Sequence, residues 1–328
     1  MPKLEELLKK TIKNVSDAVQ VGKQAGLSLT SKKELLAILQ IIATHTGHFI
    51  DGKIGRKFCK NAHNPVILLH GYLQNNSSFA GIDINLRKLL GGDDSSLYKA
   101  YSKFISIFDE INYGQLLITR RTLKIKGLED YLFNRGMCVD SPSYGFYRNL
   151  NEIAEESIHR AEKIINMEHS KKADIVGHSL GGLVALYAGV KRPDLFQRVV
   201  AIAAPYRGTI MANIAHKLTM GLAGESAEQM KEGSEFIRKL NKMNIPESII
   251  IYNFIAEYDA LIPRPEKSFI DDKPNVVNKL IEGIGHVGII GPEVYPYVYA
   301  ALTDNFQDLG LIDKKEREVS KWIKKYCR

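Results

Sequence analysis

Residues 173–182 read Ala-Asp-Ile-Val-Gly-His-Ser-Leu-Gly-Gly, and this segment carries the strongest signal of fold and chemistry in the chain. A short apolar run ends in Ser179, which has Gly177 two positions before it and Gly181 two positions after it. The spacing Gly-x-Ser-x-Gly is typical of a nucleophile elbow, where the serine occupies a cramped turn between a strand and a helix. Ordinary glycine-rich turns also contain this pattern, so the assignment depends on the rest of the chain.

Apolar runs recur along the chain and alternate with helical patterns. The runs are residues 65–69, 137–139, 175–176, 199–202 and 249–255, and the helical patterns include residues 128–133, 153–165 and 183–190. Continuous apolar runs are typical of strands buried on both faces, and strands that alternate with helices form a parallel sheet between helical layers. The predicted fold class is therefore α/β, with a mostly parallel, doubly wound sheet in a main domain over residues 63–328.

Three segments do not fit this simple alternation. Residues 1–62 are predicted to be a helical N-terminal extension, because residues 3–20 carry an apolar stripe at spacings of three and four. Residues 80–125 are predicted to be an insertion that contains a helix near residues 100–111. Residues 205–246 are long enough for a helical cap over a cleft, and their apolar content suits either a cleft for an acyl chain or ordinary helix packing.

Composition limits the class of protein. The 328 residues are 45% hydrophobic and 25% charged, which predicts one large globular domain with appendages. No apolar run reaches the length of about eighteen residues that a membrane-spanning helix needs, and the first residues lack the apolar core of a secretory signal. The cysteines Cys59, Cys138 and Cys327 are scattered without metal-ligand spacing, which favours packing roles in a cytoplasmic, reducing setting.

The chain is basic, with a net charge of +8 and a pI near 9.1. Such a surface could attract nucleic acid or anionic membrane. There is no zinc-ligand spacing and no RNA-recognition signature, so binding to nucleic acid is not predicted. A lysine-rich surface without a specific partner is the favoured interpretation. Peripheral contact with an anionic membrane, through amphipathic residues 3–20 and the lysine-rich ends, is a separate hypothesis.

Serine catalysis requires a histidine that accepts the proton of the hydroxyl group and an acid that orients this histidine. In a fold with a nucleophile elbow, the chain order is serine, acid, histidine. Of nine histidines, only His216 and His286 follow Ser179. His216 falls among the predicted cap helices, whereas His286 lies in a glycine-rich turn that follows an apolar segment. We therefore predict that His286 is the base.

The acid is expected just beyond the strand predicted at residues 249–255, on the rim that carries Ser179. Both Glu257 and Asp259 satisfy this condition, and Asp259 is preferred, partly because of the resemblance given below. Three other acids, Asp194, Asp271 and Asp272, fall in loops where solvated carboxylates are common. The oxyanion of an acyl-transfer reaction needs two backbone donors. We expect these to be the amides of Leu180 and Tyr72, with Leu73 as the alternative to Tyr72.

Several ordered segments resemble the α/β-hydrolase superfamily, and within it bacterial-type lipases and esterases. The similar segments are residues 66–71, 177–182, 203–209, 232–241, 259–263 and 285–288. Residues 205–209, Pro-Tyr-Arg-Gly-Thr, also resemble a segment of lipase-like GPI-inositol deacylases. The resemblance implies an α/β-hydrolase fold with a triad of Ser179, Asp259 and His286. It also implies that Asp140 is a structural acid.

Together these patterns predict a serine hydrolase that cleaves carboxylic esters, among them acyl lipids or other apolar acyl esters, through an acyl-enzyme. This chemistry requires no metal and no organic cofactor. A thioesterase, an amidase or an acyltransferase could use the same triad. A non-catalytic protein that binds a membrane or a partner through a vestigial hydrolase fold is the alternative from a different class.

Overall fold

The computed structural model describes residues 64–305 except for 73, 75, 80–81, 86, 88–91, 106–110, 114–115, 119–121, 126, 146, 210–223, 260, 287 and 292–293. The predicted N-terminal extension, the end of the chain and the apolar part of the predicted cap lie outside the described residues. His216 and Leu73, both considered as site residues, lie outside them as well.

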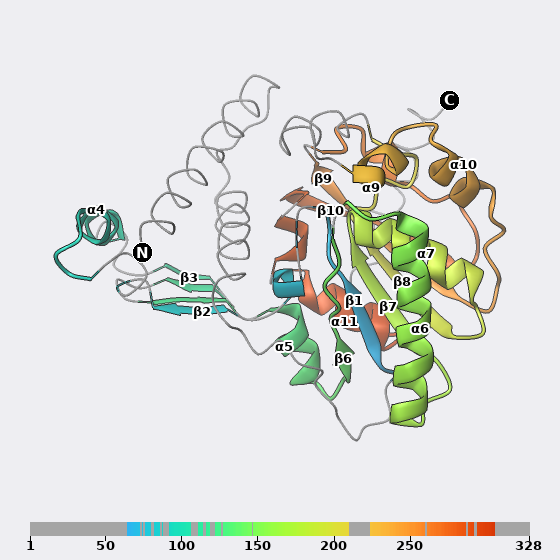
Figure 1. The fold of residues 1–328 in the computed structure, drawn as a ribbon, viewed down its shortest axis with the longest axis horizontal. Coiled ribbons are helices and arrows are strands. Elements are labelled where there is room, and N and C mark those ends of the chain that lie inside the picture. Colours follow the sequence, from blue (N-terminus) through green and yellow to red (C-terminus); the bar gives the residue numbers. More distant parts are fainter. Residues whose placement is uncertain are drawn as a thin grey trace.

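A six-stranded sheet forms the centre of the described fold, in the order β10-β9-β8-β7-β1-β6 (Figure 1). The strands are β1 (Val66–Leu69), β6 (Val139–Asp140), β7 (Ala173–His178), β8 (Phe196–Ile202), β9 (Ile250–Tyr258) and β10 (Val276–Gly285). All five pairings between neighbours are parallel. The predicted α/β class is thus confirmed, and the carboxyl ends of the strands meet at one edge of the sheet.

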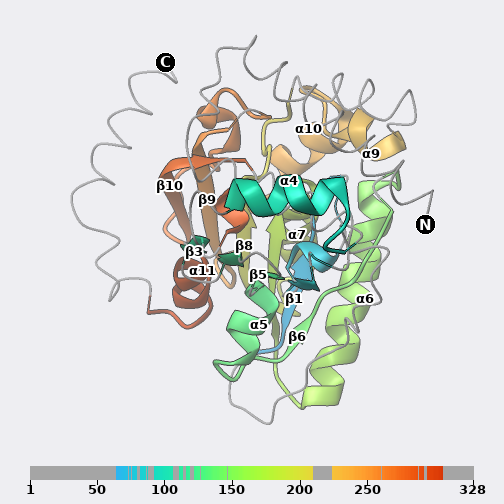
Figure 2. The same cartoon turned by 90° about the vertical axis from the view of Figure 1, so that its left-hand side faces the viewer.

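Helices cover both faces of this sheet (Figures 1 and 2). The helices α6 (Leu150–Glu168) and α7 (Leu180–Lys191) lie on one face, and α5 (Leu128–Phe133) and α11 (Tyr295–Leu302) lie on the other. Alternate residues of β1 belong to the two cores: Ile67 packs on the α6–α7 side and Leu68 on the α5–α11 side. Burial on both faces explains why the strand is a continuous apolar run.

The insertion differs from its prediction. Its elements are β2 (Ile82–Asn85), α4 (Ser96–Ile105), β3 (Ile111–Tyr113), β4 (Leu116–Ile118) and β5 (Thr122–Ile125). The strands form an antiparallel sheet in the order β2-β5-β4-β3, beside the main sheet (Figure 1). The helix expected near residues 100–111 begins earlier and ends at Ile105, and the small sheet was not predicted. Strands of three or four residues are too short for their periodicity to be distinguished in the sequence.

Two helices in the predicted cap region are described, α9 (Gly224–Gln229) and α10 (Glu235–Lys242). They lie beyond the carboxyl ends of the central strands (Figure 1). The Glu225 amide donates to the Tyr147 carbonyl at 3.1 Å, and the Leu150 amide donates to Gln229 Oε1 at 2.7 Å. These contacts attach α9 to the loop that precedes α6.

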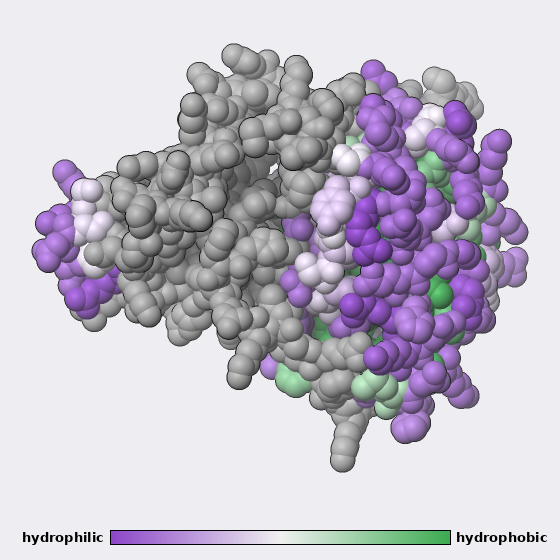
Figure 3. Space-filling view, viewed as in Figure 1, coloured by the Kyte–Doolittle hydropathy of each residue, from purple (hydrophilic) through white to green (hydrophobic). Residues whose placement is uncertain are grey.

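The described face seen in Figure 3 is mainly hydrophilic, with small, separate hydrophobic spots. Among the helices in the described part of the chain, none combines the length and the apolar character needed to cross a membrane.

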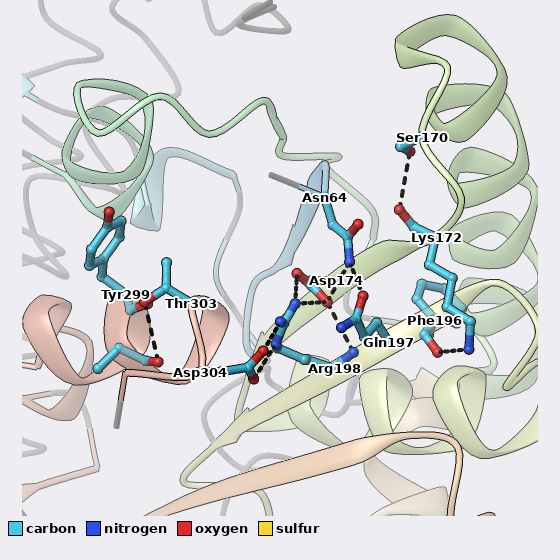
Figure 4. Close-up of polar contacts among 11 residues, drawn as sticks. Asn64, Ser170, Lys172, Asp174, Phe196, Gln197, Arg198, Tyr299, Thr303 and Asp304 are labelled. Atoms are coloured by element: carbon cyan, nitrogen blue, oxygen red, sulfur yellow. Dashed lines mark hydrogen bonds and ion pairs between the residues drawn. The ribbon is translucent and has the colours of Figure 1, made fainter. Parts of the chain in front are cut away.

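A buried group of charges joins the amino-terminal ends of β7 and β8 to the chain after α11 (Figure 4). Arg198 Nη1 lies 3.1 Å from Asp174 Oδ2, and the same guanidinium forms an ion pair with Asp304. The Arg198 amide also donates to Asp174 Oδ1 at 3.0 Å, and Asn64 adds a weaker contact of 3.5 Å. Burial raises the pKa of Asp174 to about 6, although Arg198 opposes this effect.

Removing the Arg198 cation should strongly destabilise the fold. The substitution Arg198→Met leaves the Asp174 carboxylate buried without its cation, and we expect a loss of about 3 kcal/mol in the free energy of unfolding. Arg192 provides a control, because its ion pairs with Asp194 and Glu162 both lie near the surface and Arg192→Met should cost less than about 1 kcal/mol. Urea unfolding at pH 7.5 measures both values. Equal losses in the two variants would contradict the role assigned to Arg198.

Candidate active site

Ser179 occupies the single position between a strand and a helix. The strand β7 ends at His178, and α7 begins at Leu180. Ser179 has φ 54° and ψ −118°, a conformation that costs about 1–3 kcal/mol for a residue other than glycine. Its amide donates to the Ile202 carbonyl of β8 at 2.8 Å, which extends the hydrogen bonding of the sheet by one residue. The geometry is that of a nucleophile elbow.

The two glycines around Ser179 are required by close packing. A β-carbon at Gly177 would lie 2.1 Å from the Gly181 carbonyl oxygen, and one at Gly181 would lie 2.2 Å from the Leu69 carbonyl oxygen. Real β-carbons do not approach backbone atoms this closely. The glycine spacing in the sequence therefore reflects how tightly the first turn of α7 packs onto the ends of β7 and β1.

Asp259 and His286 form a buried pair at the carboxyl edge of the sheet. His286 Nδ1 lies 2.7 Å from Asp259 Oδ2. The other carboxylate oxygen of Asp259 accepts hydrogen bonds from the amides of Leu261 at 2.9 Å and Ile262 at 2.7 Å. The side chains of Asp259 and His286 are only 3% and 5% exposed. The carboxylate is thus held at both oxygens, and the contact at Nδ1 leaves Nε2 of His286 as the nitrogen that can accept a proton.

His178 connects this pair to the serine. Nε2 of His178 lies 2.8 Å from the His286 carbonyl oxygen, and the two imidazole rings are 4.9 Å apart between centroids. Ser179 follows His178 directly, so the predicted nucleophile and the loop of the predicted base lie at the same carboxyl edge of the sheet. Asp259 and His286 are thus in direct contact, and Ser179 is joined to them through the neighbouring His178, at the ends of β7, β9 and β10.

The alternative acids have other contacts. Glu257 Oε2 accepts a hydrogen bond from the Gly283 amide at 2.7 Å, at the irregular part of β10. Asp271 pairs with Arg207, and Asp194 pairs with Arg192, both at exposed positions. Asp140, taken as structural, contacts Arg160 of α6 at 3.2 Å. Among the acids weighed from the sequence, Asp259 therefore has the contact with His286, and Glu257 supports the main chain of β10.

The turn after β1 packs directly against Ser179. The Gln74 amide donates to the Gly71 carbonyl at 3.2 Å, and Gln74 Oε1 accepts from the Gly71 amide at 2.8 Å, so Tyr72 lies within a closed turn. A β-carbon at Gly71 would lie 3.2 Å from the β-carbon of Ser179. Leu180 opens α7, where amides have no partner within the helix. Of the two predicted oxyanion donors, Leu180 thus follows the serine directly, and Tyr72 belongs to the turn whose Gly71 approaches the serine.

His70 and Tyr144 support this turn from behind. The Tyr144 amide donates to His70 Nε2 at 3.2 Å, and the two rings stack with centroids 3.9 Å apart. Gln74 and Tyr144 were not predicted from the sequence as supporting residues. No local sequence signal marks either residue. The Gln74 side chain contacts the main chain of Gly71, and Tyr144 contacts His70, 74 positions away, and neither contact leaves a pattern in the sequence.

His178 is a buried, neutral imidazole. Burial, together with the neighbouring His286 ring, lowers the pKa of His178 to about 3. In the unfolded chain a histidine has a pKa of about 6.5, so between these values the unfolded state binds a proton that the folded state does not. Acid should therefore weaken the fold through His178, beginning as the pH falls below about 6.5.

This effect should be visible in unfolding experiments. Between pH 8 and pH 5, His178 should account for about 1–2 kcal/mol of the fall in the free energy of unfolding. His178→Gln removes the titrating group, so this variant should lose less stability than the wild type over the same interval. The exposed His159 provides the control, since His159→Gln should keep the wild-type dependence. Urea denaturation at both pH values measures the free energy of unfolding. An equal fall in all three proteins would refute the attribution of this effect to His178.

Comparison with known proteins agrees with this architecture. Residues 152–253 match the Esterase family model. The match begins in α6 and ends within β9, so it includes Ser179 but neither Asp259 nor His286.

Solved structures of lipases and esterases also align with the chain. The mature form of Bacillus licheniformis lipase BlEst2 aligns at a TM-score of 0.47 and 12% identity, over 76% of this chain and 95% of that one. The monoacylglycerol lipase of Paleococcus ferrophilus aligns at 0.41 and 14%, over 75% and 96% of the two chains. The Pyrococcus furiosus esterase Pf2001 aligns at 0.42 and 14%, over 76% and 84%.

The parallel sheet with helices on both faces and the elbow after β7 are features of the α/β-hydrolase fold, and residues 152–253 within this fold match the Esterase family model. Over these matched residues, the chain is similar to the Esterase family. The resemblance of residues 205–209 to GPI-inositol deacylases receives no support from these matches and stays a prediction from the sequence.

Proposed function

We propose that the protein is a serine hydrolase of carboxylic esters. The observation that carries this proposal is the buried hydrogen bond between Asp259 and His286, beside the strained turn at Ser179. An acid, an imidazole and a serine in this order and arrangement suit acyl transfer. The Esterase match over residues 152–253 supports the same class of reaction.

In the proposed mechanism, His286 Nε2 takes the proton of Ser179 while the serine oxygen attacks the ester carbonyl. Asp259 keeps the proton of His286 on Nδ1 and stabilises the imidazolium that forms. The amides of Leu180 and Tyr72 donate to the oxyanion of the tetrahedral intermediate. His286 then gives its proton to the leaving alcohol, and water repeats the cycle on the acyl-enzyme.

The proposed substrates are esters with an apolar acyl chain, of lipid or other origin. This part of the proposal is supported by large apolar side chains exposed next to Asp259, with Tyr258 57% and Leu261 38% exposed. Tyr147, on the loop that holds α9, is exposed as well. Apolar surface beside convergent polar groups is typical of a site for an amphiphilic small molecule.

The test is a panel of p-nitrophenyl esters with acyl chains of increasing length, compared with the matching thioesters and anilides. We expect ester turnover that rises from acetate to a longer acyl chain. Faster turnover of thioesters or anilides at every length would assign the triad to a thioesterase or an amidase. Consumption of ester only when a second alcohol is added would indicate an acyltransferase.

A cytoplasmic setting is part of the proposal and rests on the scattered cysteines, of which Cys138 is a buried thiol. Peripheral contact with an anionic membrane is also a proposal, and it depends on residues 3–20, which the structure does not describe. Flotation with anionic liposomes, with and without these residues, tests it. Equal binding by both forms would contradict it.

A further inference from the structure

His178 lies between the two loops that flank Ser179. On one side, Nε2 of its ring is 2.8 Å from the carbonyl oxygen of His286. On the other side, Nδ1 is 3.1 Å from Gln74 Oε1, and a β-carbon at Gly71 would lie 2.9 Å from the same nitrogen. The ring is 1% exposed. It therefore fills the space between the turn after β1 and the loop after β10.

The contact with His286 fixes the protonation state of the ring. A carbonyl oxygen can only accept a hydrogen bond, so the proton of the neutral imidazole of His178 is on Nε2. Nδ1 then carries no proton, so it forms no hydrogen bond with Gln74 Oε1, and these two atoms are only in van der Waals contact. As a neutral ring, His178 places no positive charge beside the imidazolium that would form on His286.

The hydrogen bond restrains a part of His286 that Asp259 does not reach. Asp259 holds the imidazole at Nδ1, whereas His178 holds the main-chain carbonyl of the same residue. A ring held at one nitrogen alone can still move with its loop. Proton transfer depends on the position of Nε2 relative to the serine hydroxyl, and a displacement of about 1 Å can cost about 100-fold in rate.

We infer that His178 is a positioning residue, which ties the loop of the base to the turn of the nucleophile through its Nε2–H and the His286 carbonyl. This inference rests on the proposed function. His178 directly precedes Ser179 in the chain, so any shift of the His286 loop away from the serine must break or stretch this one hydrogen bond. The residue thus sets the distance between nucleophile and base.

Two substitutions of similar size test the hydrogen bond. In His178→Gln, the side-chain amide can place its NH₂ group near the former Nε2 and donate to the His286 carbonyl. In His178→Asn, the amide is one carbon shorter and cannot reach it. We expect His178→Asn to lower kcat about 30- to 100-fold with KM changed less than about threefold. His178→Gln should stay within about fivefold of the wild type, and His159→Asn on the exposed face of α6 should be unchanged.

A double-mutant cycle separates positioning from general damage to the site. If His178 acts through His286, His178→Asn should have less than about a twofold effect on the residual rate of His286→Ala. A further loss of tenfold or more in that background would overturn the inference, and so would a folded His178→Gln as impaired as His178→Asn. If His178→Asn does not fold, the inference is tested by His178→Gln alone, and a folded His178→Gln that falls well outside fivefold of the wild-type rate would overturn it. Retention of ester turnover by Ser179→Ala would refute the proposed function itself. This result is independent of the outcomes for the His178 variants.

Discussion

Ser179→Ala should lower kcat/KM for an activated ester by at least about 10⁴-fold. The hydroxyl oxygen is the only atom of the proposed triad that bonds to the substrate, so its removal leaves His286 without a group to deprotonate. The alanine methyl group fits where the serine side chain already lies, and the variant should fold. Initial rates with p-nitrophenyl butyrate, or with the best ester of the panel, measure the effect.

Ser170→Ala is the matched control for this experiment. Ser170 lies near the opposite end of the sheet and donates to the Lys172 carbonyl at 3.1 Å (Figure 4). We expect this variant to keep at least about half of the wild-type rate, because it removes one surface hydrogen bond. A rate for Ser179→Ala within tenfold of the control would contradict the role of Ser179 as nucleophile.

Asp259→Asn should lower kcat about 10³- to 10⁴-fold, with a much smaller change in KM. An asparagine can still accept the backbone hydrogen bonds of Leu261 and Ile262, so the loop should keep its shape. However, the amide has no negative charge to stabilise the imidazolium, and it favours the wrong histidine tautomer when its NH₂ group faces Nδ1. The experiment separates the electrostatic role of Asp259 from its structural one.

Glu257→Gln is the comparison variant. Glu257 lies two residues earlier in the chain and contacts the Gly283 amide, so we expect it to keep kcat within about fivefold. The two variants decide between the acids that the sequence leaves open. A larger loss in Glu257→Gln than in Asp259→Asn would reverse the assignment.

The sequence predicts five of the six central strands because they are buried on both faces, whereas β10 was not predicted as a strand and most of its residues are only half-buried. In β1 and β8, nearly every residue is buried, so each strand is a continuous apolar run that stands out from its surroundings. The elbow is equally visible, because the close approaches at Gly177 and Gly181 exclude any other residue type. These signals are local, and each can be recognised without knowledge of its partner.

Other features depend on contacts between distant residues and cannot be predicted in the same way. The small sheet of β2 to β5 consists of strands too short to show a period. The choice of Asp259 over Glu257 depends on how β9 and β10 pair, and both acids satisfy every local rule. His178 could be assigned to the elbow from the sequence, but its contact with His286 joins residues 108 positions apart.

Covalent labelling tests directly whether Ser179 is the nucleophile. The full-length protein is treated with a fluorophosphonate, which phosphonylates activated serines, and the modified peptide is identified by mass spectrometry. We expect one adduct per chain, on Ser179, and a loss of labelling in both Ser179→Ala and His286→Ala. A folded wild-type protein that remains unlabelled, or carries its adduct on another residue, would show that Ser179 is not the nucleophile.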